Sequence, residues 1–446
     1  REGACCVSKE LFVLLSDRVV GRVTQDDRAR FSFIYDEGWR DVRGTYPLSL
    51  SMPLAAIEHR HEAISAYVWG LLPDNELVLD RWAKRFQVSA RNPFALIANV
   101  GEDCAGAVQF VRPERLDAVL AGETGDVAWL ENAEIAARIR QLREDQSAWR
   151  RPGDTGQFSL AGAQPKTALL LQDGRWGVPS GRIPTTHILK PPSADFDGHA
   201  ENEHFCLALA RALGLPVATS TVMRFEDEVV FVVDRYDRQA TDRGVIRIHQ
   251  EDMCQALGVP PTHKYENEGG PGVSAIAGLL REHSRASAED VQTFLDALAL
   301  NWLIGGTDAH AKNYSILIGA AGRIRLAPLY DVASILPYGD FDPMRVKLAM
   351  KIGGKYRLRD ISPRNWEKVA DELGLDQRAI SERIRAMADA LPAAADGVQR
   401  DMRDAGMAHE IVDRLADMLK DRAAKSSKLF ALAESVAAAM GDSAAG

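Results

Sequence analysis

The sequence has few cysteines and no long apolar segment. Only five of its 446 residues are cysteines, and they are scattered without a Cys-x-x-Cys pair, which argues against a disulfide framework or a zinc site. No apolar run approaches the roughly 18 residues that would suggest a membrane span. The opening segment REGACCVSKE lacks the apolar core of a signal peptide. These absences predict a cytoplasmic protein that does not interact with a membrane.

The chain has fewer basic than acidic residues. The chain has 54 Lys and Arg against 63 Asp and Glu, a formal net charge of −9, which argues against a general polyanion-binding surface. A local basic patch or a DNA-binding partner stays open. With 46% hydrophobic and 26% charged residues, the composition is that of an ordinary globular protein. The length predicts roughly two to three domains, each able to bury a core.

Changes of pattern along the chain predict three regions. Residues 1–115 look β-rich, and LFVLLSDRVVGRVTQDDRARFSFIY suggests two apolar segments in a hairpin around Asp26-Asp27, before a polar connector with one amphipathic helix. Residues 116–240 contain short strands around Gly and Pro turns, with strand–loop–strand in GQFSLAGAQPKTALLLQ and a helix in ENEHFCLALARALGLP. Residues 241–446 are mainly helical, and residues 287–290 have the form of a capping box.

The helix that follows this capping box leads into the segment IGGTDAHAKNYSILIG. Asp308 and Asn313 in that segment stand five positions apart, as do the Asp and Asn of the protein-kinase loop H-R-D-x-x-x-x-N. Phosphoryl transfer needs a carboxylate to accept the hydroxyl proton and hard oxygen ligands for Mg²⁺. Asp308 suits the first task and Asn313 part of the second. A capped loop after a helix would give the same pattern.

Three further features occur in the order that a kinase uses. The loop SLAGAQPK has small residues that let backbone N–H groups approach phosphate, and Lys166 adds a positive charge. Lys190 ends a predicted strand and could reach phosphates, with Glu201 or Glu203 as its acidic partner. Asp331 follows the apolar segment RIRLAPLY, where kinases place their second metal-binding Asp. Taken singly, these features could be a hairpin turn, a solvated strand end and the cap of a following helix or turn.

The chain resembles the HipA family of serine/threonine-kinase toxins over almost its whole length. The resemblance rests on the segments LSLSMPL, GLLPDN, SLAGAQPKTALL, HILKP, NEHFCLALARALGLPVA, DRYDR, RIHQEDMCQALG, GGTDAHAKNYSIL and LAPLYDVAS. It implies an α+β, protein-kinase-like two-lobed fold with an N-terminal β-rich subdomain and a helical C-terminal lobe. It also implies a toxin of a type II toxin–antitoxin module that uses ATP and Mg²⁺.

The resemblance assigns roles to individual residues. Asp308 would be the catalytic base, and Asn313 and Asp331 would hold Mg²⁺. Ser159 would be autophosphorylated, which inactivates the enzyme, although spacing alone favours a turn serine bonded to its own backbone. The residues that would bind ATP, in the phosphate loop, the strand, the adenine hinge and the catalytic loop, are Ala161, Gly162, Ala163, Gln164, Pro165, Lys166, Lys190, Asp234, Arg235, Tyr236, His310, Lys312 and Tyr330.

The resemblance also implies partners. The substrate would be a serine of an aminoacyl-tRNA synthetase, the glutamyl enzyme favoured, and its phosphorylation would arrest translation and cause dormancy. A small helix-turn-helix antitoxin, HipB, would neutralise the kinase. The pair would bind operator DNA mainly through the antitoxin, which fits the acidic charge of this chain. Two alternatives stay open: a small-molecule phosphotransferase, and a kinase-like scaffold that acts only as a co-repressor.

Overall fold

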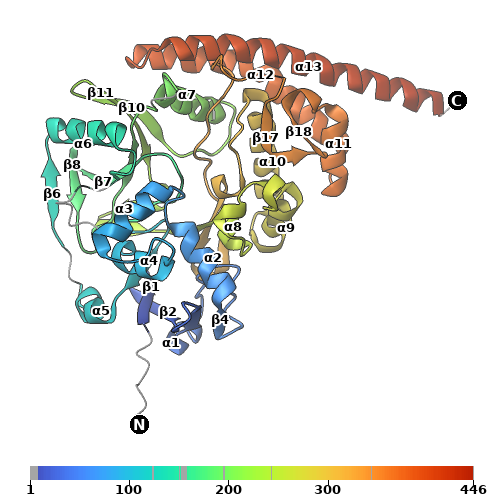
Figure 1. Ribbon diagram of the computed structural model, residues 1–446. Helices are drawn as coiled ribbons and strands as arrows, with labels where there is room; N and C mark the ends of the chain where they lie inside the picture. The colour runs from blue at the N-terminus through green and yellow to red at the C-terminus, as the bar shows by residue number, and fades with distance from the viewer. Residues whose placement is uncertain are drawn as a thin grey trace. The chain divides into compact units, whose positions relative to one another are not determined.

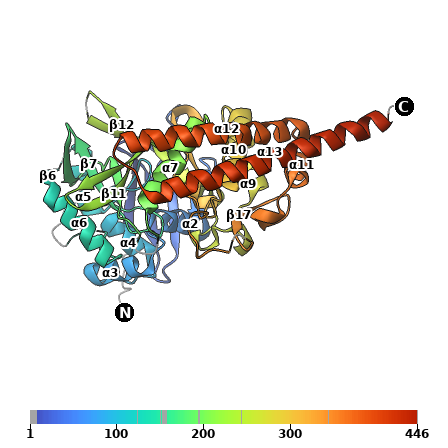
Figure 2. The ribbon, with the colours of Figure 1, turned by 90° about the horizontal axis from the view of Figure 1, so that it is seen from above.

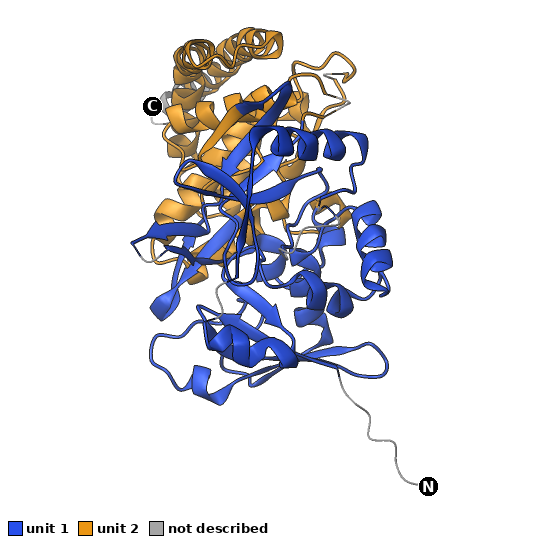
Figure 3. Ribbon diagram, turned by 90° about the vertical axis from the view of Figure 1, so that its left-hand side faces the viewer, with its two compact units in different colours: residues 1–191, 223–264, 315–327 blue, residues 192–222, 265–314, 328–446 orange. Residues whose placement is uncertain are grey.

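The computed structural model divides the chain into two compact units (Figure 3). The first unit comprises residues 1–191, 223–264 and 315–327, and the second unit comprises residues 192–222, 265–314 and 328–446. The residues that the structure describes are 9–122, 125–149, 151, 158–193, 196–242, 244–342 and 344–444. Cys5 and Cys6 lie outside them. Among the described helices, none combines the length and apolarity needed to cross a membrane.

A five-stranded antiparallel sheet begins the first unit (Figure 1). Its order is β4-β3-β2-β1-β5, and the strands are β1 Lys9–Leu15, β2 Arg18–Gln25, β3 Phe31–Tyr35, β4 Glu58–Arg60 and β5 Val108–Val111. The hairpin expected at Asp26-Asp27 is confirmed between β2 and β3. A further turn at Ser16 and Asp17, both at positive φ, splits the first apolar segment into two strands. Ser-Asp is not the Asn-Gly or Asp-Gly pair that usually marks such a turn, so the sequence analysis missed it.

Helices also make up much of the N-terminal region (residues 9–122), which the sequence analysis expected to be β-rich. Their bounds are α1 Glu37–Arg40, α2 His61–Leu71, α3 Glu76–Phe86, α4 Pro93–Val100 and α5 Pro113–Leu120. The side chains of Asn75 and Asn92 cap α3 and α4 by accepting backbone N–H groups. The β-rich expectation was therefore incomplete. Helix α2 buries residues on most of its surface, so its helical periodicity is weak in the sequence.

A six-stranded sheet contains Lys190 and Asp234, two of the residues assigned to nucleotide binding, both of which belong to the first unit. Its order is β10-β11-β9-β7-β8-β6, and the strands are β6 Val127–Leu130, β7 Thr167–Gln172, β8 Arg175–Pro179, β9 His187–Lys190, β10 Ser220–Phe225 and β11 Glu228–Asp234. The expected connector helix is α6 Asn132–Glu144, whose Arg140 and Arg143 pair with Glu228 of β11. In the strand–loop–strand expected around SLAGAQPK, only the second strand is found among the described residues. Phe158 makes one parallel bridge, to Asp103, and residues 156–157 are not described.

Smaller elements occur in both units. The strands are β12 Arg238–Thr241, β13 Gly244–Arg247, β14 His249–Asp252, β15 Ser315–Gly319, β16 Arg323–Leu326, β17 Lys347–Ile352 and β18 Lys355–Arg357. The short helices are α8 Met253–Ala256 and the 3-10 turns Pro261–His263, Glu266–Glu268, Ala311–Asn313, Ala320–Gly322 and Leu358–Asp360. Strand β16 confirms the strand expected in RIRLAPLY but ends at Leu326.

Helices dominate the second unit, as expected. They are α7 His199–Ala212, α9 Val273–His283, α10 Ser287–Ile304, α11 Pro363–Glu372, α12 Gln377–Asp404 and α13 Glu410–Ala444. Helices α12 and α13 run side by side in both views (Figures 1 and 2). Trp302 of α10 meets Trp366 of α11 and Phe430 of α13 edge-on, with ring centroids 6.0 and 6.1 Å apart. These buried rings fix the helix that leads into the Asp308 loop.

The capping box expected at residues 287–290 is wrong. Helix α10 begins at Ser287 itself, its N-cap is Ala286, and no side chain caps it. Instead, the Ser284 hydroxyl donates to Oδ2 of Asp290 at 2.5 Å and accepts the N–H of Ala286 at 3.1 Å. The first turn of α10 is therefore tied to a serine three positions before the expected cap.

Candidate active site

Two glycines at the end of α10 set the path of the loop that contains Asp308. Gly305 has a φ of +68°, in the left-handed region that favours glycine. A Cβ on Gly306 would lie 2.1 Å from Oδ1 of Asn301, so any larger residue there would clash. The chain can therefore turn directly from the end of the helix into the polar segment.

Within this loop, the side chain of Asn313 closes back onto Asp308. Nδ2 of Asn313 donates to the backbone carbonyl of Asp308 at 2.7 Å. The Asp308 side chain is 67% exposed, whereas His310, Lys312 and Asn313 are buried. The five-residue spacing thus corresponds to a closed loop. The loop exposes the carboxylate of Asp308 to solvent and fixes the side-chain amide of Asn313 by a hydrogen bond.

Tyr265, which the sequence analysis did not single out, contacts the same carboxylate. Its hydroxyl donates to Oδ1 of Asp308 at 2.5 Å, and its ring meets the His310 ring edge-on with centroids 4.9 Å apart. Nε2 of His310 lies 4.0 Å from the same oxygen of Asp308. Tyr265 lies 43 positions before Asp308, so no local pattern linked the two. Its hydroxyl holds an otherwise exposed carboxylate in one orientation.

Tyr330 and Asp331 come after β16 in the chain and belong to the second unit. The Tyr330 hydroxyl donates to the backbone carbonyl of Lys312 at 2.6 Å, which ties this segment to the Asp308 loop. Asp331 is exposed and has a φ of +57°, which is uncommon outside glycine and is enriched at functional sites. In the described part of the chain no helix begins at Val332, so Asp331 is not a helix cap.

Ser159 begins the phosphate loop and is fully buried in the first unit. Its hydroxyl donates to the backbone carbonyl of Leu71 at 2.8 Å. Its backbone N–H donates to the backbone carbonyl of Asp103 at 2.9 Å. The simpler alternative, a turn serine bonded to its own backbone, is therefore wrong. The hydroxyl is instead bonded to a residue 88 positions away.

The rest of the phosphate loop is also held by the N-terminal region. The N–H of Asp74 donates to the carbonyl of Gly162 at 3.1 Å, and Nδ2 of Asn75 donates to that of Ala163 at 3.2 Å. Gly162 has a φ of +98°, and Nζ of Lys166 donates to the carbonyl of Ala161 at 2.7 Å. Gln164 and Pro165 lie in the same loop and are partly exposed. The segment is therefore a pinned loop and not a plain hairpin turn.

Lys190 lies at the end of β9 and is only 6% exposed. Its neighbour across the sheet is Phe231 of β11, and Nζ lies 5.4 Å from the centroid of the Phe231 ring. Lys190 is thus not a solvated strand end. Glu201 and Glu203, the proposed acidic partners, lie on α7 in the second unit, and both are buried.

The residues assigned to the adenine hinge stand at the end of β11. Asp234 is exposed and pairs with His187 at 3.1 Å, whereas Arg235 is buried. The Tyr236 hydroxyl donates to Gln250, and burial raises the pKa of Tyr236 well above its ordinary value. These side chains are engaged within the first unit. A role in nucleotide binding would therefore fall to the backbone, as expected for a hinge.

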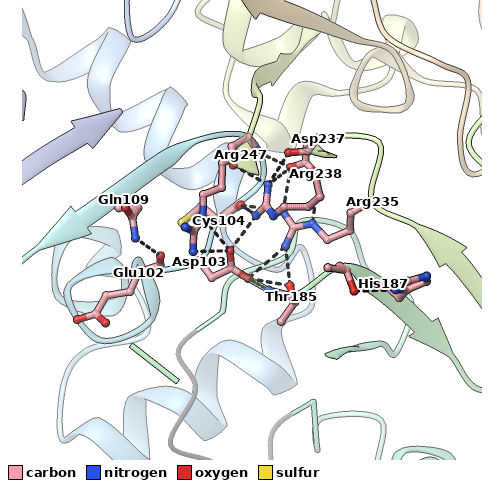
Figure 4. Close-up of polar contacts among 12 residues, drawn as sticks. Glu102, Asp103, Cys104, Gln109, Thr185, His187, Arg235, Asp237, Arg238 and Arg247 are labelled. Carbon is pink, nitrogen blue, oxygen red and sulfur yellow. Dashed lines mark hydrogen bonds and ion pairs between the residues drawn. The ribbon is translucent and has the colours of Figure 1, made fainter. Parts of the chain in front are cut away.

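A buried ion network lies directly beside this hinge (Figure 4). The Asp103 carboxylate accepts from Arg238 at 2.8 Å, Arg247 at 3.3 Å and Arg235 at 3.4 Å, and Asp237 pairs with Arg235 and Arg238 at 2.9 Å. Burial alone would raise the pKa of Asp103, but the three arginines hold it well below its ordinary value. No local pattern marks Asp103 in the sequence, because these three arginines lie 132 to 144 positions away.

The donor chemistry of the second unit fits Mg²⁺. Among the described residues no group of three or more His, Cys, Asp or Glu is arranged to hold a metal ion. Mg²⁺ does not need such a group, because proteins commonly bind it through one or two side chains together with water and substrate phosphates. Asn313 and Asp331 offer an amide and a carboxylate, which are hard oxygen donors of the kind that Mg²⁺ requires.

Comparison with known families decides how these features are to be understood. The model of the HipA-like C-terminal domain matches residues 158–395, and the model of the HipA N-terminal domain matches residues 11–111. The chain belongs to the HipA family. The C-terminal match contains the Asp308 loop, and the N-terminal match contains Asp103.

Related proteins carry names that describe kinases. Y4mE of Sinorhizobium fredii, whose name gives kinase as its provisional activity, is 39% identical over 91% of this chain and 96% of its own length. The serine/threonine-protein kinase toxin HipA of Shewanella oneidensis is 30% identical over 85% of this chain and 87% of its own length. A solved structure of a Shewanella oneidensis HipA–HipB–operator DNA complex matches with a TM-score of 0.80 and 27% identity, covering 94% of this chain and 98% of that one. The expected α+β HipA-type fold is confirmed.

Proposed function

We propose that this HipA-family protein is a cytoplasmic toxin kinase that transfers the γ-phosphate of ATP to a serine of a protein substrate. The observation that supports it most strongly is the Asp308 loop, with an exposed carboxylate held by Tyr265 and closed by Asn313. The kinase names of its relatives support the same chemistry. The proposed N-terminal subdomain, nucleotide-binding lobe and catalytic lobe are residues 1–115, 116–240 and 241–446.

In this proposal Asp308 accepts the proton of the substrate's serine hydroxyl. The serine oxygen bonds to the γ-phosphorus of ATP while the bond between the γ-phosphorus and ADP breaks. The exposure of Asp308 leaves a carboxylate oxygen accessible to a protein substrate. Asn313 and Asp331 hold Mg²⁺, which neutralises charge on the transferring phosphate when it is bound. His310 and Lys312 lie beside the phosphates, where the buried positive charge of Lys312 stabilises the transition state.

The remaining ATP contacts in this proposal are the phosphate loop, Lys190, the hinge and Tyr330. The loop from Ala161 to Lys166 encloses the phosphates with backbone N–H groups, and Lys190 adds charge from the sheet. The backbone of residues 234–236 receives the adenine. The burial of Lys190 and the pinning of the loop support these roles, because a site ordered before binding loses less entropy when ATP binds.

Autophosphorylation of Ser159 belongs to the same proposal. Its hydroxyl is buried and bonded to Leu71, so the loop must open before the serine can react. A phosphate adds nearly two negative charges and three acceptors, which cannot return to a buried position without compensating charge. The modified loop would therefore stay open, and the ATP site would lose its phosphate-binding backbone.

The proposed substrate is a serine of an aminoacyl-tRNA synthetase, with the glutamyl enzyme favoured, and its modification arrests translation. The proposed partner is a HipB-like helix-turn-helix antitoxin that binds operator DNA together with the toxin. The structure of the Shewanella complex supports this partner, and the net charge of −9 supports DNA contact made mainly by the antitoxin.

Transfer of labelled γ-phosphate in a bacterial lysate tests the proposal. Wild-type protein with Mg-ATP should label one synthetase and, by mass spectrometry, its own Ser159, whereas Asp308→Gln should abolish both and still bind ATP. Labelling of a metabolite instead of a protein would favour a small-molecule phosphotransferase. Absence of any labelling, with operator binding retained beside an antitoxin, would favour a co-repressor scaffold.

A further inference from the structure

We infer that Asp103, a residue of the N-terminal region, positions both the adenine hinge and the phosphate loop of the nucleotide site. Asp103 is thus a positioning residue that sets the affinity for ATP and the preference for adenine, although it does not touch the reacting atoms. The inference rests on the proposed nucleotide site, and the experiment below separates the failure of one from the failure of the other.

The side chain of Asp103 controls the hinge through Arg235. Arg235 is fixed at two points: its backbone N–H donates to the carbonyl of Thr186 at 2.9 Å, and its guanidinium reaches Asp103 and Asp237. Thr185 joins the group, because its hydroxyl donates to Oδ2 of Asp103 at 2.7 Å and contacts Nη1 of Arg235 at 2.9 Å. The direction of the hinge peptide is therefore determined by the Asp103 carboxylate (Figure 4).

The backbone next to Asp103 takes part in the same arrangement. The carbonyl of Cys104 accepts from Arg235 at 2.8 Å and from Arg238 at 2.9 Å, and the N–H of Gly106 donates to Oδ2 of Asp237 at 2.6 Å. Gly106 has a φ of +78°, and a Cβ there would lie 2.7 Å from the backbone nitrogen of Gln250. The loop that carries Asp103 is thus held in one conformation by the residues that follow the hinge.

The backbone carbonyl of Asp103 connects this network to the phosphate loop. This carbonyl accepts the N–H of Ser159 at 2.9 Å. Phe158, which precedes Ser159, forms a parallel β-bridge with Asp103. One residue therefore holds the hinge with its side chain and the start of the phosphate loop with its main chain. ATP needs both parts in register, because its adenine and its phosphates are joined by a ribose of fixed size.

A purely stabilising role would not require this design. Buried ion pairs contribute little net stability compared with apolar side chains of the same size, because the desolvation of the charges offsets their attraction. A network of this kind does fix geometry, since each arginine fork allows few orientations. Loss of the Asp103 charge should therefore affect the geometry of the hinge as well as stability.

Calorimetric titration with the Mg²⁺ complexes of non-hydrolysable ATP and GTP analogues tests the inference. Asp103→Asn should weaken binding of the ATP analogue at least tenfold and lower the ATP-to-GTP affinity ratio at least threefold. Thr185→Val, which removes the two hydrogen bonds that the hydroxyl makes with Asp103 and Arg235 and keeps the shape of the side chain, should weaken ATP binding about threefold. Glu228→Gln is the matched control, because it removes a buried carboxylate paired with two arginines at the other end of β11.

The outcomes distinguish a failure of the proposed function from a failure of the positioning role of Asp103. If the wild-type protein does not bind the ATP analogue, the proposed function fails. If it binds, and Asp103→Asn and Thr185→Val keep its affinity and base preference while only their unfolding temperature falls, the positioning role is overturned. If Asp103→Asn does not fold, Thr185→Val and Asp103→Glu test the positioning role instead. Asp103→Glu keeps the negative charge and should keep the preference for adenine. An equal loss of ATP affinity in Glu228→Gln would also contradict the inference.

Discussion

Replacing Asn75 by Asp should loosen the phosphate loop without disturbing the helix that follows Asn75. Oδ1 of Asn75 caps α3 by accepting the N–H groups of Leu77 and Val78, whereas Nδ2 donates to the carbonyl of Ala163 at 3.2 Å. Asp is as good an N-cap as Asn, so the cap is kept. The donor to the loop is lost, and a negative charge is placed opposite the carbonyl.

The size of the effect follows from the exposure of this contact. A hydrogen bond of this kind contributes about 1 kcal/mol, so its loss raises the population of the open loop about fivefold. Ser159 is buried in the closed loop, and its phosphorylation should therefore accelerate about fivefold. Because the closed loop remains the main state, the affinity for ATP should change less than twofold.

Quantitative mass spectrometry of phosphorylated Ser159 over time, at saturating Mg-ATP, measures this rate. Asn92→Asp is the matched control, since Asn92 caps α4 in the same way and its Nδ2 donates to Gln25 instead of to the phosphate loop. It should autophosphorylate at the wild-type rate. If Asn75→Asp increased hydrogen exchange in residues 159–166 but left the rate unchanged, opening of the loop would not limit autophosphorylation.

Two further substitutions address separate parts of the molecule. Tyr265→Phe removes the hydrogen bond to Asp308, worth about 1 kcal/mol at this exposed position, and should lower kcat for phosphate transfer about fivefold with KM for ATP unchanged; a raised KM with normal kcat would contradict its positioning role. Burial raises the pKa of Glu251 from 4.5 to about 8, so folding stability should fall as pH rises between these values. Glu251→Gln should flatten the dependence of the unfolding temperature on pH, and an unchanged slope would refute this cause.

The parts of the site that lie close together in the sequence were predictable. Asp308 and Asn313 are close in the chain and close in space, because a short loop can bring only near residues together. Lys190 was predicted because it ends an apolar strand and Asp331 because it comes after one, and strand ends are where side chains of this type meet ligands. The helical second unit was predictable from periodicity in the same way.

Contacts between distant residues were not predictable. Tyr265 and Asp103 lie in segments with no motif, and their partners are 43 and more than 130 positions away. The turn at Ser16-Asp17 was missed because its residues are not the usual ones. At Ser287 the expected capping box does not form, and the hydroxyl of Ser284 donates a hydrogen bond to Asp290 instead. The contacts of Tyr265 and Asp103 are tertiary and are not displayed by a single sequence, whereas the turn and the helix start are local features with unusual residues.

The N-terminal region shows why this difference matters for function. Its contacts to the phosphate loop come from Leu71, Asp74 and Asn75 of the GLLPDN segment, and its contacts to the hinge come from Asp103. The sequence predicted no chemical role for any of these residues. A region without reactive groups can still determine activity if it fixes the backbone that binds the nucleotide. Substitutions at Asp103 should therefore change ATP affinity and those at Asn75 the accessibility of Ser159, while those in the Asp308 loop should change the rate of phosphate transfer itself.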